Sequence, residues 1–552
     1  MDKKQLDKLE AVKKNLEQDK SMYLAKWREL AQFLGISFSN WTGDANAEKL
    51  AETRDITDST ADEAGDLMAS GIQGYACGAS NAWFSMAFED MENNKNNSLS
   101  GALKECEKHI YKQFAKADFY TSSFSATLSN VHLGTAIIWM EENAQRNQPS
   151  YTVLHPRDCN IMENTAHEVD VLFRDFWLTQ EDAIKEFGED NLPSKVRNGK
   201  DPMQKFQFTN YVGPRSKFGM KDAVPGEKDF ISVYWMKDDI RKTLKEEEYD
   251  VKPFAVWRWS RPIYGGSWGV DSPGMKQLSN IKQVNGLIED KTRLSQLQAV
   301  GYGKKTRGLK VNLVPNGFTE LGPGEDFTVI RPAGDLSWTD ELIKELQQKI
   351  KSAYYSDYFL ILSSTIEQRK TATEANGLQE EKSVIMASFF SRMGAEFLEP
   401  VIEWTFQNEL RHGRLPWLAK FTEEEIVGRE IKIDFISQLA KTQERAARHA
   451  PNQAYMSQLV QLMQVFPEAR FKVDVMEYLD DVAKEYGTNE KIVVTTAKAR
   501  AEAQAVAQAQ AQQMQAQQQM QNLKELGGAV KDLSGKVDDS SVISQLQGGG
   551  NG

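Results

Sequence analysis

The stretch SPGMKQLSNIKQVNGLIEDKTRLSQLQAV, residues 272–300, predicts one long helix with an apolar side and several charged sides. Ser272 is a favoured N-cap and Pro273 a favoured first helical residue, so the helix should begin here. Apolar residues then recur every three or four positions over about 27 residues; they are Leu278, Ile281, Val284, Ile288, Leu294 and Leu297. The flanking faces carry Lys276, Lys282, Glu289, Asp290, Lys291 and Arg293.

A shorter helix is predicted to return after a glycine-rich lobe. Residues 301–337 hold seven glycines and three prolines, and the pieces LKVNLV and DFTVIR alternate in polarity as small strands do. Ser337 and Asp340 form a helix-start signal, and apolar residues follow at helical spacing: Leu342, Leu346, Ile350 and Ala353. Neither helix of this hairpin has enough apolar surface to bury itself alone, so we expect neighbouring molecules, most simply identical copies.

The next stretch, YFLILSSTIEQRKTATEANGLQEEK, runs from residue 358 to 382 and changes character twice. It opens with an apolar run, then shows the adjacent cations Arg369 and Lys370. Thr371 and Glu374 form a capping box, which predicts that a helix begins there. The apolar pattern continues to Leu410, so this helix would have up to about 38 residues and a length of roughly 57 Å. Pro400 lies inside it and should kink it without ending it.

The remaining segments indicate an α+β fold that is mainly helical. Helical spacing covers about residues 1–35, 58–78 and 100–135. Between 150 and 260, four aromatic and β-branched stretches predict strands: YTVLHP, VDVLFRDFWL, DFISVYWM and PFAVWRW. Residues 431–500 suggest further helices. The Ala/Gln-rich stretch 501–521 predicts a helix that needs support from other copies.

Composition restricts the possible classes of protein. The 552 residues are 40% hydrophobic and 26% charged, which favours a folded chain, and the net charge of −12 argues against an open DNA-gripping surface. Three scattered cysteines, Cys77, Cys106 and Cys159, favour a reducing compartment. No apolar run approaches the ~20 residues of a membrane span, and the charged N-terminus does not resemble a secretory signal.

Motifs for catalysis, metals and cofactors are not found. GYGKKTRG at 301–308 fits neither nucleotide-binding glycine pattern and follows a helix instead of a strand. Cys106 and His109 form half of a zinc pattern, for which ordinary helix packing is the better reading. Acidic runs such as 423–425 are most simply solvated faces. We therefore predict no catalytic residue, no metal site and no cofactor.

Four segments in order resemble the portal, or head-to-tail connector, proteins of short-tailed double-stranded DNA bacteriophages. These are residues 58–86, ending in NAWFSM; 173–193, FRDFWLTQEDAIKEFGEDNLP; 253–285, beginning PFAVWRW; and 371–416, ending in RHGRLP. The likeness extends over about residues 20–500. One departure is Gly-Gly-Ser-Trp-Gly before the long helix, where the family has a tighter Gly-x-Ser-Pro form.

The resemblance implies a ring of twelve subunits at one capsid vertex. It would divide the chain into an α+β wing (1–271), a stem helix (272–300), a clip (301–337) and a stem return helix (338–357). A channel loop (358–373), a long kinked wing helix with its exit (374–430) and a helical crown (431–500) would follow. Residues 501–552 would form an Ala/Gln-rich helical tail with a loose glycine-rich end.

Candidate functional residues follow from this division. Arg369 and Lys370 would face double-stranded DNA in the channel; the alternative is a merely solvated loop. Leu287 and Leu294 would hold neighbouring stem helices together. A cluster of clip cations would dock an acidic partner, unless it serves only solubility; it consists of Lys304, Lys305, Arg307 and Lys310.

The implied partners are those of a virion component assembled in the bacterial cytoplasm. They are identical copies in a dodecamer, double-stranded DNA, major capsid and scaffolding proteins, the terminase motor and later a tail adaptor, with no membrane insertion. Two alternatives stay open. One is the packaging ATPase, against which the missing P-loop speaks; the other is a ring-forming tail adaptor or connector without a packaging role.

Overall fold

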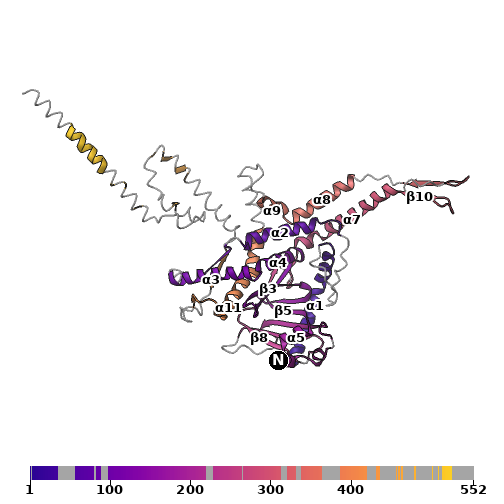
Figure 1. The fold of residues 1–552 in the computed structure, drawn as a ribbon, viewed down its shortest axis with the longest axis horizontal. Helices are drawn as coiled ribbons and strands as arrows, with labels where there is room; N and C mark the ends of the chain where they lie inside the picture. The colour runs from indigo at the N-terminus through magenta and orange to yellow at the C-terminus, as the bar shows by residue number, and fades with distance from the viewer. Residues whose placement is uncertain are drawn as a thin grey trace, which may run out of the picture. The chain divides into compact units, whose positions relative to one another are not determined.

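The computed structural model divides into two compact units, Met1–Lys441 and Thr442–Gly552, described separately here (Figure 1). In the first unit the structure describes residues 1, 3–34, 56–79, 82–88, 97–199, 201–218, 228–240, 242–263, 265–311, 320–330, 337–363, 386–418 and 431–435. In the second it describes 456, 458–459, 462–463, 466, 478–479, 500, 506, 508 and 512–524.

A five-stranded antiparallel sheet forms one part of the first unit. Its order is β4-β5-β6-β7-β8, with β4 at Cys159–Glu163, β5 at Val169–Thr179, β6 at Lys205–Pro214, β7 at Phe230–Met236 and β8 at Lys245–Tyr249. Side chains alternate between its faces, as strand geometry requires. Val171, Phe173 and Trp235 pack beneath the first half of α1 (Lys3–Ala31), together with Leu6 and Leu9.

The opposite face of this sheet is covered by two short helices, α5 (Gln180–Phe187) and α6 (Ser194–Arg197). Phe187 and Val196 from these helices meet Phe208 and Met236 from the sheet. Thr179, the last residue of β5, is the N-cap of α5. Its side chain accepts a hydrogen bond from the Asp182 amide, so the strand leads directly into the helix.

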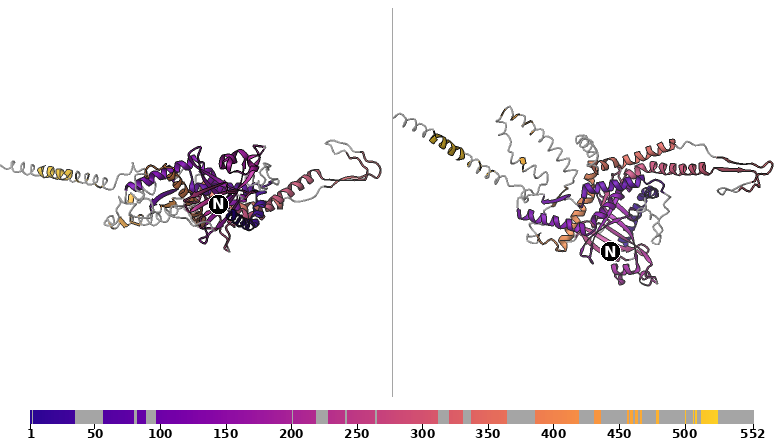
Figure 2. Two further views of the ribbon diagram at one scale, coloured as in Figure 1. Left: turned by 90° about the horizontal axis from the view of Figure 1, so that it is seen from below. Right: turned by 45° about the horizontal axis from the view of Figure 1, so that its top comes forward.

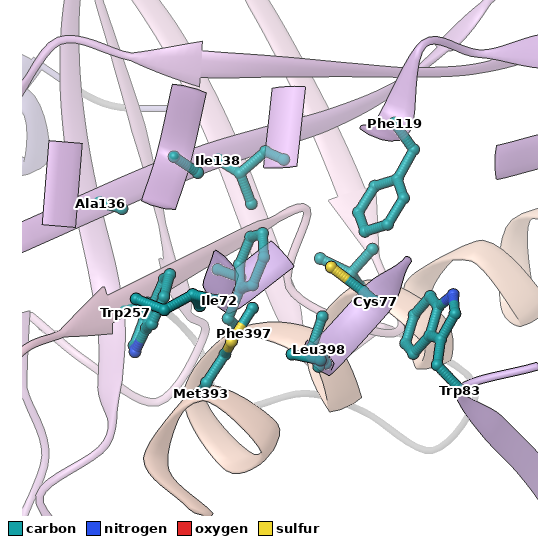
Figure 3. Packing of buried hydrophobic residues seen from close by; sticks show 14 of the residues in the cluster. Ile72, Cys77, Trp83, Phe119, Ala136, Ile138, Trp257, Met393, Phe397 and Leu398 are labelled. Atoms are coloured by element: carbon teal, nitrogen blue, oxygen red, sulfur yellow. The ribbon is translucent and has the colours of Figure 1, made fainter. Parts of the chain in front are cut away.

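The main core surrounds a three-stranded sheet of order β3-β2-β9. Its strands are β2 (Thr135–Asn143), β3 (Gln148–Leu154) and β9 (Phe254–Arg258). The helices α2 (Thr60–Cys77), α3 (Asn97–Lys116) and α4 (Phe119–Leu133) contribute to the same core. Figure 3 shows Ile72 and Cys77 of α2 among Phe119, Ile138, Trp257 and Phe397.

The long helix after residue 385 passes through this core. Residues 386–393 are α-helical, Gly394–Leu398 form a π-helical turn, and α11 continues over Glu399–Arg411. The helix therefore continues past Pro400, as predicted. Proline has no amide hydrogen to bond the Glu396 carbonyl, and the Glu399 amide instead donates to the Gly394 carbonyl, five residues back.

The predicted helical hairpin is present. Helix α7 spans Pro273–Val300 and α8 spans Ser337–Ala353, and the two run side by side in Figures 1 and 2. Between them, β10 (Tyr302–Lys305) pairs antiparallel with β11 (Phe327–Ile330). A further helix, α9 (Ser356–Ser363), follows α8.

The α+β class is confirmed, while the structure differs from the prediction at three places. The predicted channel loop, 358–373, starts with helix through Ser363. The predicted strand LKVNLV is not extended in a sheet at 309–311, its remaining residues lie outside the described residues, and the strand that pairs with β11 is 302–305. The predicted helical segment 431–500 opens with strand β12 (Ile431–Phe435), which pairs with β1 (Phe84–Phe88).

Other predictions fall partly outside the described residues. The capping box at Thr371 and Glu374 lies outside them, as does the first part of the long helix. Within the second unit, residues 512–524 are helical and solvent-exposed. Among the helices that the structure describes, none is long and apolar enough to cross a membrane.

Candidate functional site

The root of the hairpin is fixed at the start of α7. The Ser272 hydroxyl accepts a hydrogen bond from the Met275 amide (3.3 Å) and donates one to the His132 carbonyl (2.9 Å). Pro273 occupies the first helical turn, as the sequence predicts. A Cβ on Gly274 would lie 2.6 Å from that same His132 oxygen, so only glycine allows this approach. The hairpin is thereby tied to the end of α4.

A polar cluster, here named the hairpin latch, joins both stem helices to the body. The latch consists of Thr57, Asp58, Asn285 and Gln347. The Asn285 Oδ1 atom accepts hydrogen bonds from the Thr57 and Asp58 amides (3.0 and 3.1 Å). The Gln347 side chain donates to Asp58 Oδ2 (2.6 Å). Asn285 is buried on α7 and Gln347 lies on α8, so the segment before α2 bridges the two helices.

The two predicted oligomerisation residues have different environments. Leu287 is half-buried and packs against the main core of its own chain. Leu294 is also half-buried, but it belongs to none of the buried clusters of the described residues. Farther along, Lys291 forms an ion pair with Asp340 between α7 and α8. Leu294 is therefore the clearer candidate for contact with another molecule.

The four predicted docking cations gather on one short exposed segment at the hairpin tip. Lys304 and Lys305 end β10, and Arg307 and Lys310 flank the turn that follows. The Lys305 ammonium donates to the Leu309 carbonyl (2.9 Å), so its charge is partly used inside the lobe. Lys304, Arg307 and Lys310 form no ion pair with any residue that the structure describes.

Large apolar side chains are also exposed near the tip: Leu321, Val329, Ile330 and Trp338. Trp338, at the start of α8, has 68% of its surface exposed. Exposed apolar groups of this size beside cations are typical of a contact surface. Sequence reasoning named the cations and missed the apolar groups.

Arg369 and Lys370, the predicted channel residues, lie outside the described residues. Helix α9 precedes them in the sequence, and its residues Tyr358 and Phe359 are buried in the main core. A Cβ on Gly71 of α2 would lie 2.1 Å from the Phe359 ring, so the two helices approach as closely as glycine allows.

A buried arginine, which no local sequence pattern indicates, organises the π-helical turn. Arg258 at the end of β9 is 1% exposed and pairs with Glu163 (2.8 Å) and Glu396 (2.8 Å). Its guanidinium also donates to the His167 carbonyl (2.7 Å). Burial tends to raise the pKa of Glu163, but hydrogen bonds and charge from Arg258 outweigh burial and lower it.

A second arginine closes the end of the long helix. Arg414 donates to both carboxylate oxygens of Glu142 and of Glu409, at 2.7–2.9 Å. Glu409 is fully buried and also contacts His109 Nε2 (2.7 Å). His109 thus contacts a carboxylate. The described residues contain no group of three or more potential ligands arranged for a metal ion.

The cysteines do not form a reactive site in the described structure. All three are buried and unpaired. Burial raises the pKa of Cys77 to about 12 and that of Cys106 to about 11, so both stay as thiols near neutral pH. None of these three cysteines is therefore a candidate nucleophile. The surfaces that remain as candidate sites are the exposed ones of the hairpin.

Known phage proteins are similar in sequence to this chain over most of its length. Residues 6–493 match the family described as "Bacteriophage head to tail connecting protein". The chain is 23% identical over 502 residues to the "Probable portal protein" of Bordetella phage BPP-1. It is 24% identical over 499 residues to the "Portal protein" of Salmonella phage epsilon15. Each alignment covers 87% of this chain and 87% of the relative.

Proposed function

Because the chain belongs to the family of bacteriophage head to tail connecting proteins, we propose that it is the portal of a phage capsid. Twelve copies form a ring at one vertex, and double-stranded DNA enters and leaves through the central channel. The two portal relatives, each aligned over 87% of the chain, support this assignment. The role is structural, so the ring itself carries out no catalysis.

The observation that carries the proposal is the helical hairpin with its incompletely covered faces. Helix α7 spans 28 residues, about 42 Å, and leaves Leu294 half-exposed. Helix α8 begins with an exposed Trp338 in its first turn. Side-by-side packing of identical hairpins would cover these groups and line a channel, since a head-to-tail contact that closes on itself produces a ring.

We assign the remaining segments by the same proposal. Residues 1–271 and 374–430 form the wing, 272–300 and 338–357 the stem, and 301–337 the clip. The crown follows β12, because that strand pairs with β1 of the body. The clip cations dock first the terminase motor and then the tail adaptor, and the wing contacts the capsid.

Charge fits a conduit through which DNA slides. Each copy carries −12, so twelve copies carry roughly −144 (twelve times −12), and an acidic tunnel repels phosphate. Within it, Arg369 and Lys370 act as weak brakes on the duplex. Strong contacts would stall translocation.

The test is the state of assembly of the purified protein. Sedimentation and negative-stain images should show a flanged ring with an axial hole. Leu294→Asp should block ring formation, because the new charge would be buried between subunits. Leu287→Asp is less diagnostic, since Leu287 also packs within its own chain. Rings formed normally by Leu294→Asp would remove the stem assignment.

A ring-forming tail adaptor without a packaging role is the alternative. Both proteins would form rings, so assembly alone does not separate them. Empty capsid precursors assembled with this protein should package DNA when terminase and ATP are added. Rings that bind only to filled capsids, and never support filling, would favour the adaptor.

A further inference from the structure

The first unit contains a large open groove beside the π-helical turn, with a volume of about 840 Å³. One wall is an exposed helix face of Ser388, Ser391, Ala395, Glu399 and Glu403. The other walls are the loop between β4 and β5, at 164–170, and the turn at 250–252 before β9. No part of α3 lines this groove. A groove of this size between a helix and two loops can take up the side of another helix.

Three carboxylates on these walls have no ion-pair partner among the described residues: Glu168, Glu399 and Glu403. Partial burial raises the pKa of Glu399, and the negative charge of Glu168 raises it further. Burial and the charge of Glu399 likewise raise the pKa of Glu403. The three groups therefore crowd one another, although each keeps exposed surface.

The cations that line the groove form no ion pair with these three carboxylates. Lys252 attracts Glu403 but donates its hydrogen bond to the Val169 carbonyl (3.1 Å). Arg392 donates to the Trp259 carbonyl, and Arg261 forms no ion pair with a described residue. The other three acidic residues of the groove walls, Asp170, Asp250 and Glu396, are already paired, with Lys217, with Arg411 and with Arg258. The acidic wall of Glu168, Glu399 and Glu403 thus forms no ion pair within the described residues.

Helix α3 presents the complementary surface. Lys104, Lys108, Lys112 and Lys116 are all exposed and follow one another at four-residue intervals. At about 100° per residue, they lie on the side of the helix opposite the buried Cys106, Ile110 and Phe114. Lys108 forms an exposed pair with Glu105 (2.6 Å), and the other three have no ion pair with a described residue.

The simplest reading of such a lysine stripe is a solvated helix face. Two observations argue that the stripe is a contact surface. The stripe has the sign opposite to the acidic wall, and Lys104, Lys112 and Lys116 and the three carboxylates form no ion pair within the part of the chain that the structure describes. No residue of α3 lines the groove, so stripe and wall are separate surfaces of one copy.

We infer that the lysine stripe of α3 in one copy docks into the acidic groove of the next copy around the ring. The inference rests on the proposed ring and identifies one contact that would hold the wings together. Each copy would offer one donor and one acceptor surface, which is the arrangement of a head-to-tail contact. Charge pairing across it would also select the register between neighbours.

The test uses full-length chains with reversed charges. Variant A carries Lys108→Glu and Lys112→Glu, which makes the centre of its stripe acidic, like its groove. Variant B carries Glu399→Lys and Glu403→Lys, so both of its surfaces are basic. Like charges then face each other in each variant alone, and the protein concentration needed for ring assembly should rise by at least about tenfold.

Mixing the two variants gives the decisive result. The acidic stripe of A fits the basic groove of B, and the basic stripe of B fits the acidic groove of A. Equal amounts of the two variants should therefore form rings in which A and B alternate. Native mass spectrometry should then show equal copy numbers of A and B in each ring. Combining all four changes in one chain should restore assembly as well.

Matched controls separate this contact from general charge effects. Lys4→Glu with Lys8→Glu on α1, and Glu189→Lys with Asp190→Lys, change the net charge equally at other exposed sites and should assemble normally. Circular dichroism of A and B should show native folding. Normal rings from A or B alone, or folded variants that fail to rescue each other, would overturn the contact and leave the ring proposal standing. Absence of rings from the unmodified chain would instead refute the ring.

Discussion

Arg258 and Glu396 join the end of strand β9 to the π-helical turn through three hydrogen bonds. The Arg258 amide donates to Oε2 of Glu396 (2.8 Å), and its Nε and Nη2 atoms donate to Oε1 (3.2 and 2.8 Å). Phe397, the next residue, stacks on Trp257 with ring centroids 5.5 Å apart. Two consecutive residues of the turn thus contact two consecutive residues of the strand, which fixes the register of the long helix.

Replacing Arg258 with methionine should strongly destabilise the first unit. Glu163 and Glu396 would remain largely buried without their cation, and breaking a buried pair in this way costs about 3–5 kcal/mol. The free energy of unfolding from urea titration measures the loss. Lys185→Met is the control, because the pair of Lys185 with Glu181 is exposed to solvent and should contribute little to stability. Equal effects would mean that Arg258 does not hold the turn.

The same cluster predicts a specific pH dependence. Burial raises the pKa of Glu163, yet Arg258 lowers it more, so the folded-state pKa lies below the unfolded value near 4.3. As pH falls, the unfolded state binds the proton first. The stabilisation is therefore present above about pH 4.3 and is lost as pH falls through the folded pKa. Glu163→Gln should be less stable than the parent at pH 7, and the difference should shrink toward pH 3. A constant difference would contradict the assignment.

The sequence predicted those elements whose signal is local. Ser272 and Pro273 mark the start of α7 because capping depends on neighbouring residues, and the aromatic and β-branched composition of β5 and β7 appears directly in their letters. Strand β12 also has a local signal, since IKIDF alternates strictly between apolar and charged residues. Its position inside a segment of helical composition concealed it.

The buried cations could not be predicted, because their partners are distant in sequence. Lys13 is 2% exposed and pairs with Asp175 at 2.7 Å, and nothing in the neighbouring sequence indicates such a partner. Arg258 meets Glu396 across 138 residues. Only the pairing of strands and helices brings such groups together, and the hairpin latch depends on contacts of the same kind.

Removing the latch acceptor should loosen the hairpin without unfolding the body. In Asn285→Ala the Thr57 and Asp58 amides lose their shared acceptor, and an unsatisfied buried donor costs about 1–3 kcal/mol. Hydrogen exchange should accelerate at these amides and along α7. Asn280→Ala is the control, since the Asn280 side chain donates to Gln277 on the same helix and has no other side-chain bond to a described residue. Unchanged exchange in Asn285→Ala would show that the latch does not anchor the stem.

At the hairpin tip, the clip cations should matter for partner binding and not for assembly. Lys304→Glu with Arg307→Glu should leave rings intact but abolish binding of the tail adaptor, measured by co-sedimentation. Lys305→Gln should have a smaller effect, because the Lys305 ammonium is already bonded to Leu309. If the charge-reversed ring binds the adaptor normally, the cations serve solubility alone.

The last prediction concerns Arg369 and Lys370, which follow the anchored helix α9. Each exposed contact with a phosphate is worth about 1 kcal/mol or less, but in the proposed ring the contacts of twelve copies with one duplex would add up. Changing both residues to alanine should leave ring assembly normal and let capsids fill at a normal or slightly faster initial rate. DNA should then leak before the tail attaches, and faster at higher salt because these contacts are screened. The double glutamate variant should leak more.

DNA retained per particle after removal of the motor, at two salt concentrations, is the measurement. Lys4→Ala with Lys8→Ala on α1 removes the same charge at exposed positions of the body and should retain DNA as the parent does. The order expected is parent and control first, then the alanine variant, then the glutamate variant. Because the brake acts by charge, the gap between alanine and glutamate variants should narrow as salt rises. If both variants retain as much DNA as the parent, Arg369 and Lys370 do not hold the duplex, and the two cations are only solvated.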